Sequence, residues 1–217
     1  MSRPAVLDVR GTVPGAEVLA PAAAHVRAGG IVAYPTETVY GFGGLCTPGA
    51  VARVRHLKRR DPDRPLLVLI RGAADAEGLA WTGDARELAS LFWPGALTLV
   101  LADPGGIFPD GVRSAAGAVA VRVSPHPLVE TLLALVGAPL TSTSANAPGA
   151  APARSGAEAL AVARELGAGD ELLVVDGGTL PPSGPSTIVD CTGPVPAVIR
   201  EGSVPLSRLR CALPGIT

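Results

Sequence analysis

Short runs of β-branched residues alternate along this chain with longer stretches rich in alanine and leucine, and proline or glycine separates most of them. The short apolar runs predict buried strands, and the Ala/Leu stretches predict helices. The 22 prolines and 27 glycines predict tight turns between short elements. This alternation favours one α/β or interleaved α+β domain with a mixed sheet, and we assign residues 1–217 to it.

The same pattern, together with the proline and glycine positions, sets the limits of the elements. The expected helices are 16–28, 48–57, 84–92, 127–136, 156–166 and 205–210. The expected strands are 31–34, 66–70, 97–101, 118–123, 140–144, 172–175, 187–190 and 198–200. Pro62 and Pro65 exclude a helix, so we expect Arg60 to Arg64 to lie on a loop.

The composition predicts a compact globular protein. Hydrophobic residues make up 47% and charged residues 17% of the chain, with a net charge of −1. This balance argues against a protein coated by nucleic acid over its whole surface, although it leaves room for a local basic cleft. Aromatic residues are only 3%, so alanine, valine and leucine must form the core.

Cysteine usage and hydropathy indicate a reduced, cytoplasmic protein that is not in a membrane. The three cysteines are far apart and form no Cys-x-x-Cys pair, which argues against a disulfide framework and a structural zinc site. The first residues lack the apolar core of a signal peptide. The most apolar stretch, Leu88 to Ala102, is interrupted by Trp93-Pro94-Gly95 and is too short to cross a bilayer.

Lys58 is the single lysine among 18 basic residues. A compact ammonium kept within so strong an arginine bias indicates a role that a planar guanidinium cannot fill. Lys58, Arg59, Arg60 and Arg64 also place four cations in seven residues. A structural interpretation fits as well, because cations stabilise the negative end of a helix by about 0.3–1 kcal/mol.

Further polar residues follow the expected strands. They are Pro35 to Gly41, the Lys58/Arg60/Arg64 loop, Arg122, Thr141 to Asn146, Ser186-Thr187 and Arg200. Ligands of open α/β sheets bind beyond the carboxyl ends of strands, and cations with hydroxyl and amide groups are typical of anion sites.

Each segment also has a structural interpretation. The hydroxyl run can be a strand end followed by a turn-forming asparagine, and Arg122 can pair with a buried carboxylate. Ser186-Thr187 by itself is uninformative. The sequence lacks a P-loop, a complete dinucleotide-binding glycine motif and a Gly-x-Ser-x-Gly nucleophile motif, and the three histidines have no triad partners.

The order of seven motifs resembles the YrdC/TsaC family of threonylcarbamoyl-AMP synthases. The motifs are PTETVYG, K-x-R with a following Pro-Leu, WPGALTLVL, VAVRVSPHP, STSAN, GPSTIVD and IREG, and they span residues 29–202. The resemblance implies a twisted mixed sheet flanked by helices, with a positively charged cavity. It also implies a nucleotidyltransferase that condenses L-threonine, bicarbonate and ATP into threonylcarbamoyl-adenylate and pyrophosphate.

The partners follow from the same resemblance. A transferase would accept the adenylate and modify the adenosine beside the anticodon of tRNA, and weak binding of RNA to this chain is one further expectation. Mg²⁺ would accompany ATP, with no organic cofactor and no metal ligands assigned in the chain. We expect no counterpart of the extra C-terminal domain of longer family members.

Carried over position by position, the resemblance assigns the site residues. The catalytic set is Lys58, Arg60, Ser144 and Asn146. The nucleotide-binding set is Lys58, Arg60, Arg64, Ser144, Asn146 and Arg200. The threonine and carbamate set is Thr38, Arg122, Ser142 and Ser186. The chain departs from the family at Asp61, Leu69 and Pro148, where proline, histidine and serine are usual.

The mechanism that we expect relies on positioning and charge neutralisation rather than on a histidine base. The loop from Lys58 to Pro65 or the segment from Ala147 to Gly156 would close the site. The alternatives are a non-catalytic RNA-binding module, a carbamoyl-adenylate-forming domain like that of hydrogenase maturation, and a riboflavin-pathway synthase. The zinc fingers of the second and the acidic metal cluster of the third are not visible in the sequence.

Overall fold

The computed structural model of the chain describes residues 3–11, 15–61 and 63–217. The strands are β1 (Ala5–Asp8), β2 (Ile31–Pro35), β3 (Tyr40–Gly43), β4 (Leu67–Leu69), β5 (Leu97–Ala102), β6 (Ala118–Arg122), β7 (Leu140–Ser144), β8 (Leu172–Asp176), β9 (Thr187–Asp190) and β10 (Ala197–Arg200). The helices are α1 (Ala16–Arg27), α2 (Pro48–Leu57), α3 (Gly83–Phe92), α4 (Pro127–Val136), α5 (Gly156–Glu165) and α6 (Leu206–Ala212), with a 3-10 turn η1 (Ala73–Ala76).

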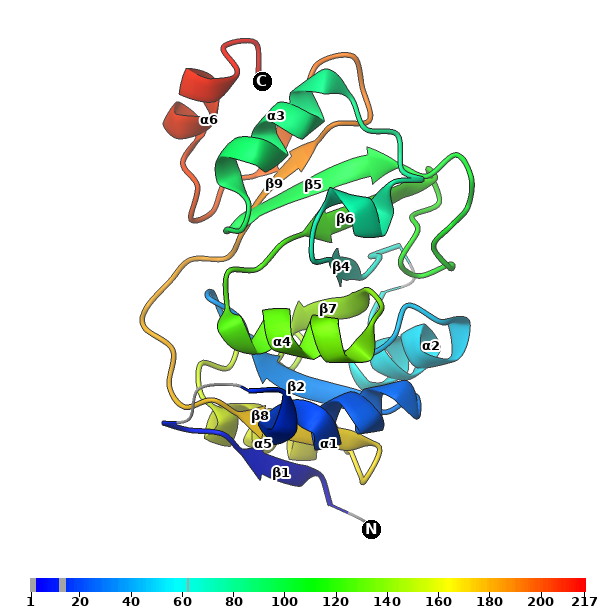
Figure 1. Ribbon diagram of the computed structural model, residues 1–217, viewed down its shortest axis with the longest axis vertical. Coiled ribbons are helices and arrows are strands. Elements are labelled where there is room, and N and C mark those ends of the chain that lie inside the picture. Colours follow the sequence, from blue (N-terminus) through cyan, green and yellow to red (C-terminus); the bar gives the residue numbers. More distant parts are fainter. Residues whose placement is uncertain (1–2, 12–14, 62) are drawn as a thin grey trace.

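The strands of the described residues form one twisted, ten-stranded mixed sheet in the order β1-β8-β2-β3-β7-β4-β6-β5-β9-β10. The pairs β1/β8, β2/β8, β4/β6 and β5/β9 are parallel, and the other neighbouring pairs are antiparallel. β1 lies at one end of the molecule and α6 at the other (Figure 1). This arrangement confirms the predicted α/β fold class with a mixed sheet flanked by helices.

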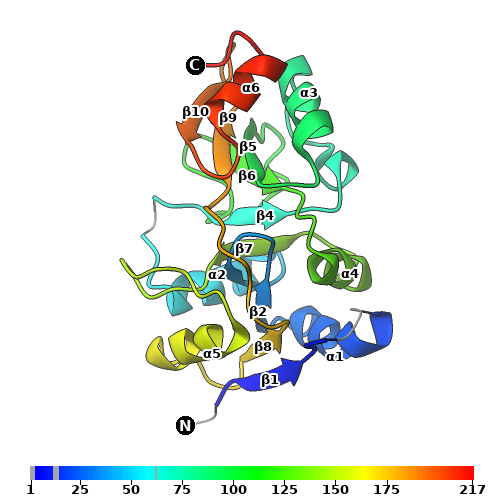
Figure 2. The ribbon, with the colours of Figure 1, turned by 90° about the vertical axis from the view of Figure 1, so that its left-hand side faces the viewer.

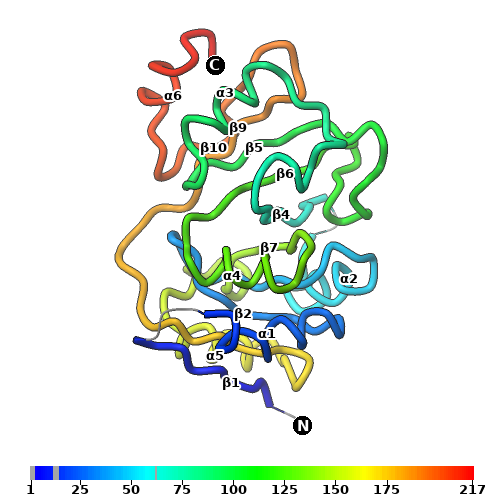
Figure 3. The backbone as a smooth tube through the Cα atoms, viewed as in Figure 1, coloured from blue at the N-terminus to red at the C-terminus, as the bar shows by residue number. Residues whose placement is uncertain are grey.

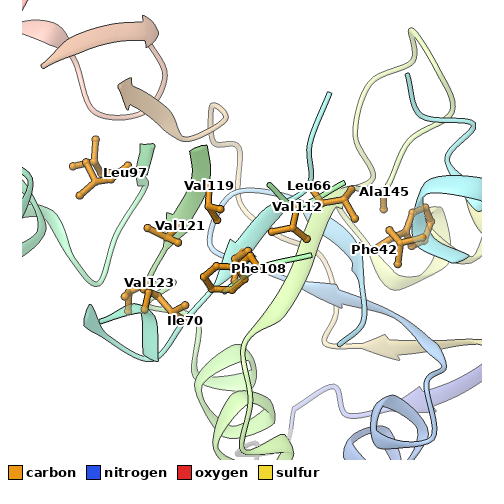
Figure 4. Packing of buried hydrophobic residues seen from close by; sticks show 14 of the residues in the cluster. Phe42, Leu66, Ile70, Leu97, Phe108, Val112, Val119, Val121, Val123 and Ala145 are labelled. Atoms are coloured by element: carbon orange, nitrogen blue, oxygen red, sulfur yellow. The ribbon is translucent and has the colours of Figure 1, made fainter. Parts of the chain in front are cut away.

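Helices cover both faces of the half of the sheet that contains β2 and β8. Figure 2 shows α1 and α4 on one side of it and α2 and α5 on the other. One core joins α1 and α4 to Tyr34, Leu69 and Leu140. The other core begins between Phe42 and α2 and continues to Leu97 and Val123 (Figure 4). The buried aliphatic side chains that dominate both cores fit the low aromatic content of the chain.

β1 and β3 were not among the strands expected from the sequence. β3 pairs on one side with β2 and on the other with β7. Its glycines make this possible, because a Cβ at Gly43 would clash with the carbonyl oxygen of Thr141. The short pattern Tyr-Gly-Phe-Gly carries little strand propensity, so the tertiary pairing decides its conformation.

The loop expected from Arg60 to Arg64 is non-helical in its described residues, and Pro62 lies outside them. β4 is shorter than the expected strand 66–70. After β8 the chain crosses much of the length of the molecule before it enters β9 (Figure 3), and this crossing joins the two ends of the sheet. The helices of the described residues are all too short or too polar to span a bilayer.

Two leucines of α3 provide a test of the core. Leu88 is fully buried, whereas Leu91 is 56% exposed on the same helix. Leu88→Ala should lower the free energy of unfolding by about 2–5 kcal/mol, because it leaves a cavity under α3. Leu91→Ala should change it by less than about 0.5 kcal/mol. Urea unfolding followed by circular dichroism measures both, and equal effects would contradict the packing of α3.

Candidate functional site

The end of α2 directs the Lys58 side chain towards the interior of the protein. Pro48 occupies the first position of the helix, and Lys58 follows its last residue. The next residue, Arg59, has a φ of 46°, which reverses the chain at the point where glycine is usually found. The amides of Arg59 and Arg60 then bond back to the carbonyl oxygens of His56 and Arg55. Lys58 is consequently only 7% exposed.

The Lys58 ammonium contacts the asparagine that follows β7. Nζ donates to the side-chain Oδ1 of Asn146 at 2.9 Å and also to its backbone carbonyl oxygen. Ser144 Oγ donates to the same Oδ1 at 2.5 Å. The Asn146 amide nitrogen donates to the carbonyl oxygens of Ala147 and Ala150, which fixes the side chain. Three of the predicted site residues, 88 positions apart at most, therefore form one contact group.

Burial and, to a smaller extent, the positive charge of Arg60 together lower the pKa of Lys58 to about 8. The ammonium is still mostly protonated at neutral pH, but its charge is only partly compensated. No carboxylate is paired with it among the described residues. An anionic ligand would supply the missing negative charge.

Arg60 extends this group towards β7. Its Nη1 donates to Thr143 Oγ1 at 3.0 Å, while Nη2 and Nε donate to the carbonyl oxygens of Pro65 and Arg64. Burial lowers the pKa of Arg60, and the charge of Arg64 acts in the same direction. The Arg64 side chain is exposed. Thr143 was not selected from the sequence, although it stands within the hydroxyl run.

Arg122 lies at the end of β6, and its side chain is nearly inaccessible to solvent. Its Nη2 forms an ion pair with Glu37, and its Nε donates to the carbonyl oxygen of Gly95 at 3.1 Å. Ser124 Oγ donates to the second carboxylate oxygen of Glu37 at 2.6 Å. A carboxylate partner for Arg122 was one of the interpretations that the sequence allowed. The structure identifies this partner as Glu37.

Burial lowers the pKa of Arg122 to about 10, so the guanidinium stays charged at neutral pH. Glu37 and Ser124 were both missed as site residues. The sequence contained a signal for both, because each lies inside a quoted motif and within two residues of a selected residue. The pairing itself joins positions 85 apart in the chain and only folding could reveal it.

Thr38 and Ser142 are both buried. Within the described residues, neither side chain has a hydrogen bond to Arg122. Thr38 Oγ1 lies 2.9 Å from Thr36 Oγ1 in a tight turn after β2. Ser142 faces Gly41, where an added Cβ would lie 3.0 Å from its Oγ. The buried Tyr34 phenol donates to the carbonyl oxygen of the neighbouring Thr141 at 3.1 Å.

Arg200 and Ser186 join the site from the far strands. Arg200 Nη2 donates to the carbonyl oxygen of Ser186 at 2.7 Å, and Ser186 Oγ lies 2.9 Å from Thr98 Oγ1. Burial lowers the pKa of Arg200, and its charge in turn lowers the pKa of Arg122. Arg200 is exposed, and its positive charge is near enough to lower the pKa of Arg122.

The predicted residues form two groups. Lys58, Arg60, Ser144 and Asn146 surround the end of α2, whereas Arg122, Arg200 and Ser186 lie around the ends of β6 and β9. Ser142 and Ser144 on β7 share one face with Arg122 through the register of β7, β4 and β6. A cavity of about 720 Å³ is lined by Arg53, Arg55, His56, Arg59 and Arg60, and Arg60 is its one predicted site residue.

The described residues contain no cluster of three or more His, Cys, Asp or Glu side chains that could hold a metal ion. The site offers ammonium, guanidinium, hydroxyl and amide groups, which suit phosphate and carboxylate oxygens. These residues do not fit a metal ion held by the protein alone. Mg²⁺ would be held here through an anionic ligand.

Comparisons with known proteins agree on a family. The family model "Telomere recombination", which covers Sua5, YciO and YrdC, matches residues 24–202. A threonylcarbamoyl-AMP synthase of Chromohalobacter salexigens is 40% identical over 183 residues, which cover 81% of this chain and 93% of that protein. A threonylcarbamoyl-AMP synthase of Bacillus subtilis is 36% identical over 200 residues, covering 90% of this chain.

The chain spans only 56% of the length of the Bacillus subtilis relative. Among solved structures, it is similar to the Sua5 protein of Pyrococcus abyssi complexed with L-threonine, with a TM-score of 0.88 and 32% identity. That match covers 98% of this chain and 62% of the other.

Because Lys58 is the single lysine, its titration can be observed directly. A sample labelled with [¹³C]lysine should give one side-chain signal, whose chemical shift changes with a midpoint near the pKa of about 8. Arg60→Gln should raise the midpoint, because it removes the nearby positive charge. Arg210→Gln, an exposed position on α6, is the control and should leave it unchanged. A wild-type midpoint at the ordinary lysine value would contradict the burial of Lys58.

Proposed function

Since the chain belongs to the Sua5/YciO/YrdC family, we propose that it is an L-threonylcarbamoyladenylate synthase. It condenses L-threonine, bicarbonate and ATP to threonylcarbamoyl-AMP and pyrophosphate. The proposal is supported by the relatives of that name, which are 36–40% identical over most of the chain. The Pyrococcus abyssi structure with L-threonine supports an amino-acid site on the same fold.

The hydrogen bonds that Lys58 and Ser144 each donate to Asn146 are the observation that supports this activity most directly. A buried, incompletely compensated ammonium with a guanidinium beside it suits the phosphates of ATP. Lys58 and Arg60 would bind the triphosphate and stabilise the departing pyrophosphate. Arg64 and Arg200 would add charge, and Ser144 and Asn146 would orient phosphate or carbamate oxygens. Mg²⁺ would enter bound to the nucleotide and neutralise part of its charge.

Arg122 would bind the carboxylate of threonine, because a planar guanidinium can hold both carboxylate oxygens. Glu37 occupies one edge of this guanidinium and would orient it, while Ser124 fixes Glu37. Thr38, Ser142 and Ser186 would contribute hydroxyl groups to threonine and to the carbamate. Their burial keeps these short donors away from competing water.

The reaction needs no covalent intermediate with the protein. The deprotonated threonine amine attacks carbon dioxide formed from bicarbonate, and loss of the amine proton gives the carbamate. A carbamate oxygen then attacks the α-phosphorus, and the bond between the α-phosphorus and the bridging oxygen breaks to release pyrophosphate. Positioned charge dominates such a transfer.

The proposed setting of this reaction is the cytoplasm, away from membranes, with residues 1–217 acting as one domain. The product would be handed to a transferase that forms N6-threonylcarbamoyladenosine in tRNA, and RNA would bind this chain only weakly. Either the loop from Lys58 to Pro65 or the segment from Ala147 to Gly156 would close over the site and protect the labile carbamate from water.

Mass spectrometry of the small-molecule product tests the function. Purified protein with threonine, bicarbonate, ATP and Mg²⁺ should form threonylcarbamoyl-AMP without any RNA, and leaving out threonine or bicarbonate should abolish it. In this assay Lys58→Ala should reduce product formation by at least ~10²-fold, a loss of about 3 kcal/mol of transition-state stabilisation. Arg210→Ala should remain fully active. Near-normal turnover of Lys58→Ala would remove Lys58 from the mechanism.

Arg122→Lys separates the amino-acid half of the site from the nucleotide half. An ammonium keeps the charge but loses the bidentate geometry, so the KM for threonine should rise by about tenfold. The KM for ATP should change by less than about twofold, since Arg122 is assigned to the carboxylate and not to the phosphates. Steady-state kinetics with either substrate varied measure this. An unchanged threonine dependence would contradict the assignment of Arg122.

A further inference from the structure

A second cavity, of about 350 Å³, lies between η1, α3 and the end of β6. Its walls include both tryptophans, Trp81 and Trp93, together with Arg86, Pro94 and Val123. None of the ten predicted site residues lines it. The cavity is therefore separate from the groups that surround Lys58 and Arg122, although Val123 directly follows Arg122 in the chain.

The two tryptophans give this cavity aromatic walls in a chain that contains only seven aromatic residues. Their rings meet edge to face, with centroids 6.0 Å apart at 89°. Trp81 Nε1 donates to the carbonyl oxygen of Ala76 at 2.9 Å, and Trp93 Nε1 donates to that of Leu97 at 2.7 Å. Because their polar atoms are bonded within the protein, the rings present apolar surface to the cavity and hold a fixed orientation.

Arg86 adds a positive charge to these walls. Its guanidinium lies over the Trp81 ring, 5.6 Å from the ring centroid. No carboxylate of the described residues forms an ion pair with it. The other arginine of the cavity, Arg71, is already paired with Asp75 at 2.6 Å. Arg86 is therefore the cation that remains open to a ligand.

We propose that this cavity binds a small planar aromatic carboxylate. The ring would pack against the tryptophans, and the carboxylate would bind Arg86. A volume of about 350 Å³ is at the lower end of the range for ligand sites, which suits a single-ring or fused-ring acid. A stacked arginine with an accessible edge favours a carboxylate over a neutral group of the same shape.

The walls of the cavity are connected to Arg122 through Gly95, which follows Pro94. The Gly95 amide donates to the carbonyl oxygen of Val123 at 2.9 Å, and the Gly95 carbonyl oxygen accepts the hydrogen bond of Arg122 Nε. A ligand packed against Pro94 and Val123 immobilises this peptide and so reinforces the orientation that Glu37 already gives the guanidinium. Threonine and the cavity ligand consequently strengthen each other's binding, a coupling that rests on the proposed function of Arg122.

Ligand-observed ¹⁹F NMR with 4-fluorobenzoate tests the site, and neutral 4-fluorobenzamide is the matched probe. Benzoate binding should saturate with a Kd below about 1 mM, and the benzamide should bind at least about fivefold more weakly. In ¹⁵N-labelled protein the indole N–H signals of the two tryptophans should shift with the same Kd. Those two signals report on this cavity alone, since the chain has no other tryptophan.

Arg86→Gln should weaken benzoate binding by at least about fivefold. The matched control is Arg208→Gln, because Arg208 likewise lies over an aromatic ring, that of Phe92 at 5.5 Å, without lining the cavity. It should bind benzoate like the wild type. Absence of saturation up to about 10 mM, or equal binding by Arg86→Gln and the wild type, would overturn the proposed site.

Saturating threonine should tighten benzoate binding by at least about twofold in the wild type and not in Arg122→Lys. A Kd that is independent of threonine would overturn the coupling. The binding experiment involves no turnover, so it gives its answer about the cavity even if the chain forms no adenylate. Failure of the cavity and failure of the proposed function are thereby distinguishable.

Discussion

A buried ammonium persists in a protein only where oxygen atoms replace the water that it gives up. Among the described residues, Lys58 meets this requirement through the backbone and side-chain oxygens of Asn146, with the ring of Phe42 at 6.0 Å. The contact depends on the chain reversal at Arg59, on the position where β7 ends, and on the hydrogen bonds that the side-chain amide of Asn146 donates. It ties the end of α2 to the centre of the sheet. Because oxygen dipoles compensate the charge incompletely, the same contact leaves the site ready for an anion.

The second cationic centre is arranged differently. Arg122 has a full carboxylate partner in Glu37, and Ser124 and Gly95 complete the arrangement. A guanidinium has five donors, so such a pairing orients it without using all of them. The site therefore combines a loosely compensated ammonium, suited to phosphates, with a firmly oriented guanidinium, suited to a carboxylate. This difference fits a reaction that joins a nucleotide to an amino acid.

β7 connects these two centres because it pairs with β3 on one side and with β4 on the other. Gly41 and Gly43 allow β3 to approach it closely, and the hydroxyl side chains of Ser142, Thr143 and Ser144 alternate between its faces. Thr143 consequently meets Arg60, while Ser144 reaches Asn146. β7 begins with the core residue Leu140 and continues with hydroxyl side chains, so it serves both the core and the site.

Much of the fold was predictable from local patterns. The helices and most of the strands follow from apolar periodicity and from proline and glycine positions, as with Pro48 at the start of α2 and Pro127 at the start of α4. β1 and β3 could not be predicted, because each is short: β1 pairs with the distant β8, and β3, although it follows β2 closely, also pairs with the distant β7. The kinds of side chain at the site were predictable too, since cationic and hydroxyl side chains gathered at strand ends are typical of anion-binding sites.

The amino-acid sequence by itself determined the fold class, the order of the motifs and the residue types available for binding anions. Tertiary structure decided which of these residues meet. Glu37 pairs with Arg122, Thr143 with Arg60, and both tryptophans meet at one cavity, although nothing in the local sequence specifies these partners. The physical reason is that local propensity acts over a few residues, whereas charge pairing and packing depend on distances set by the whole sheet.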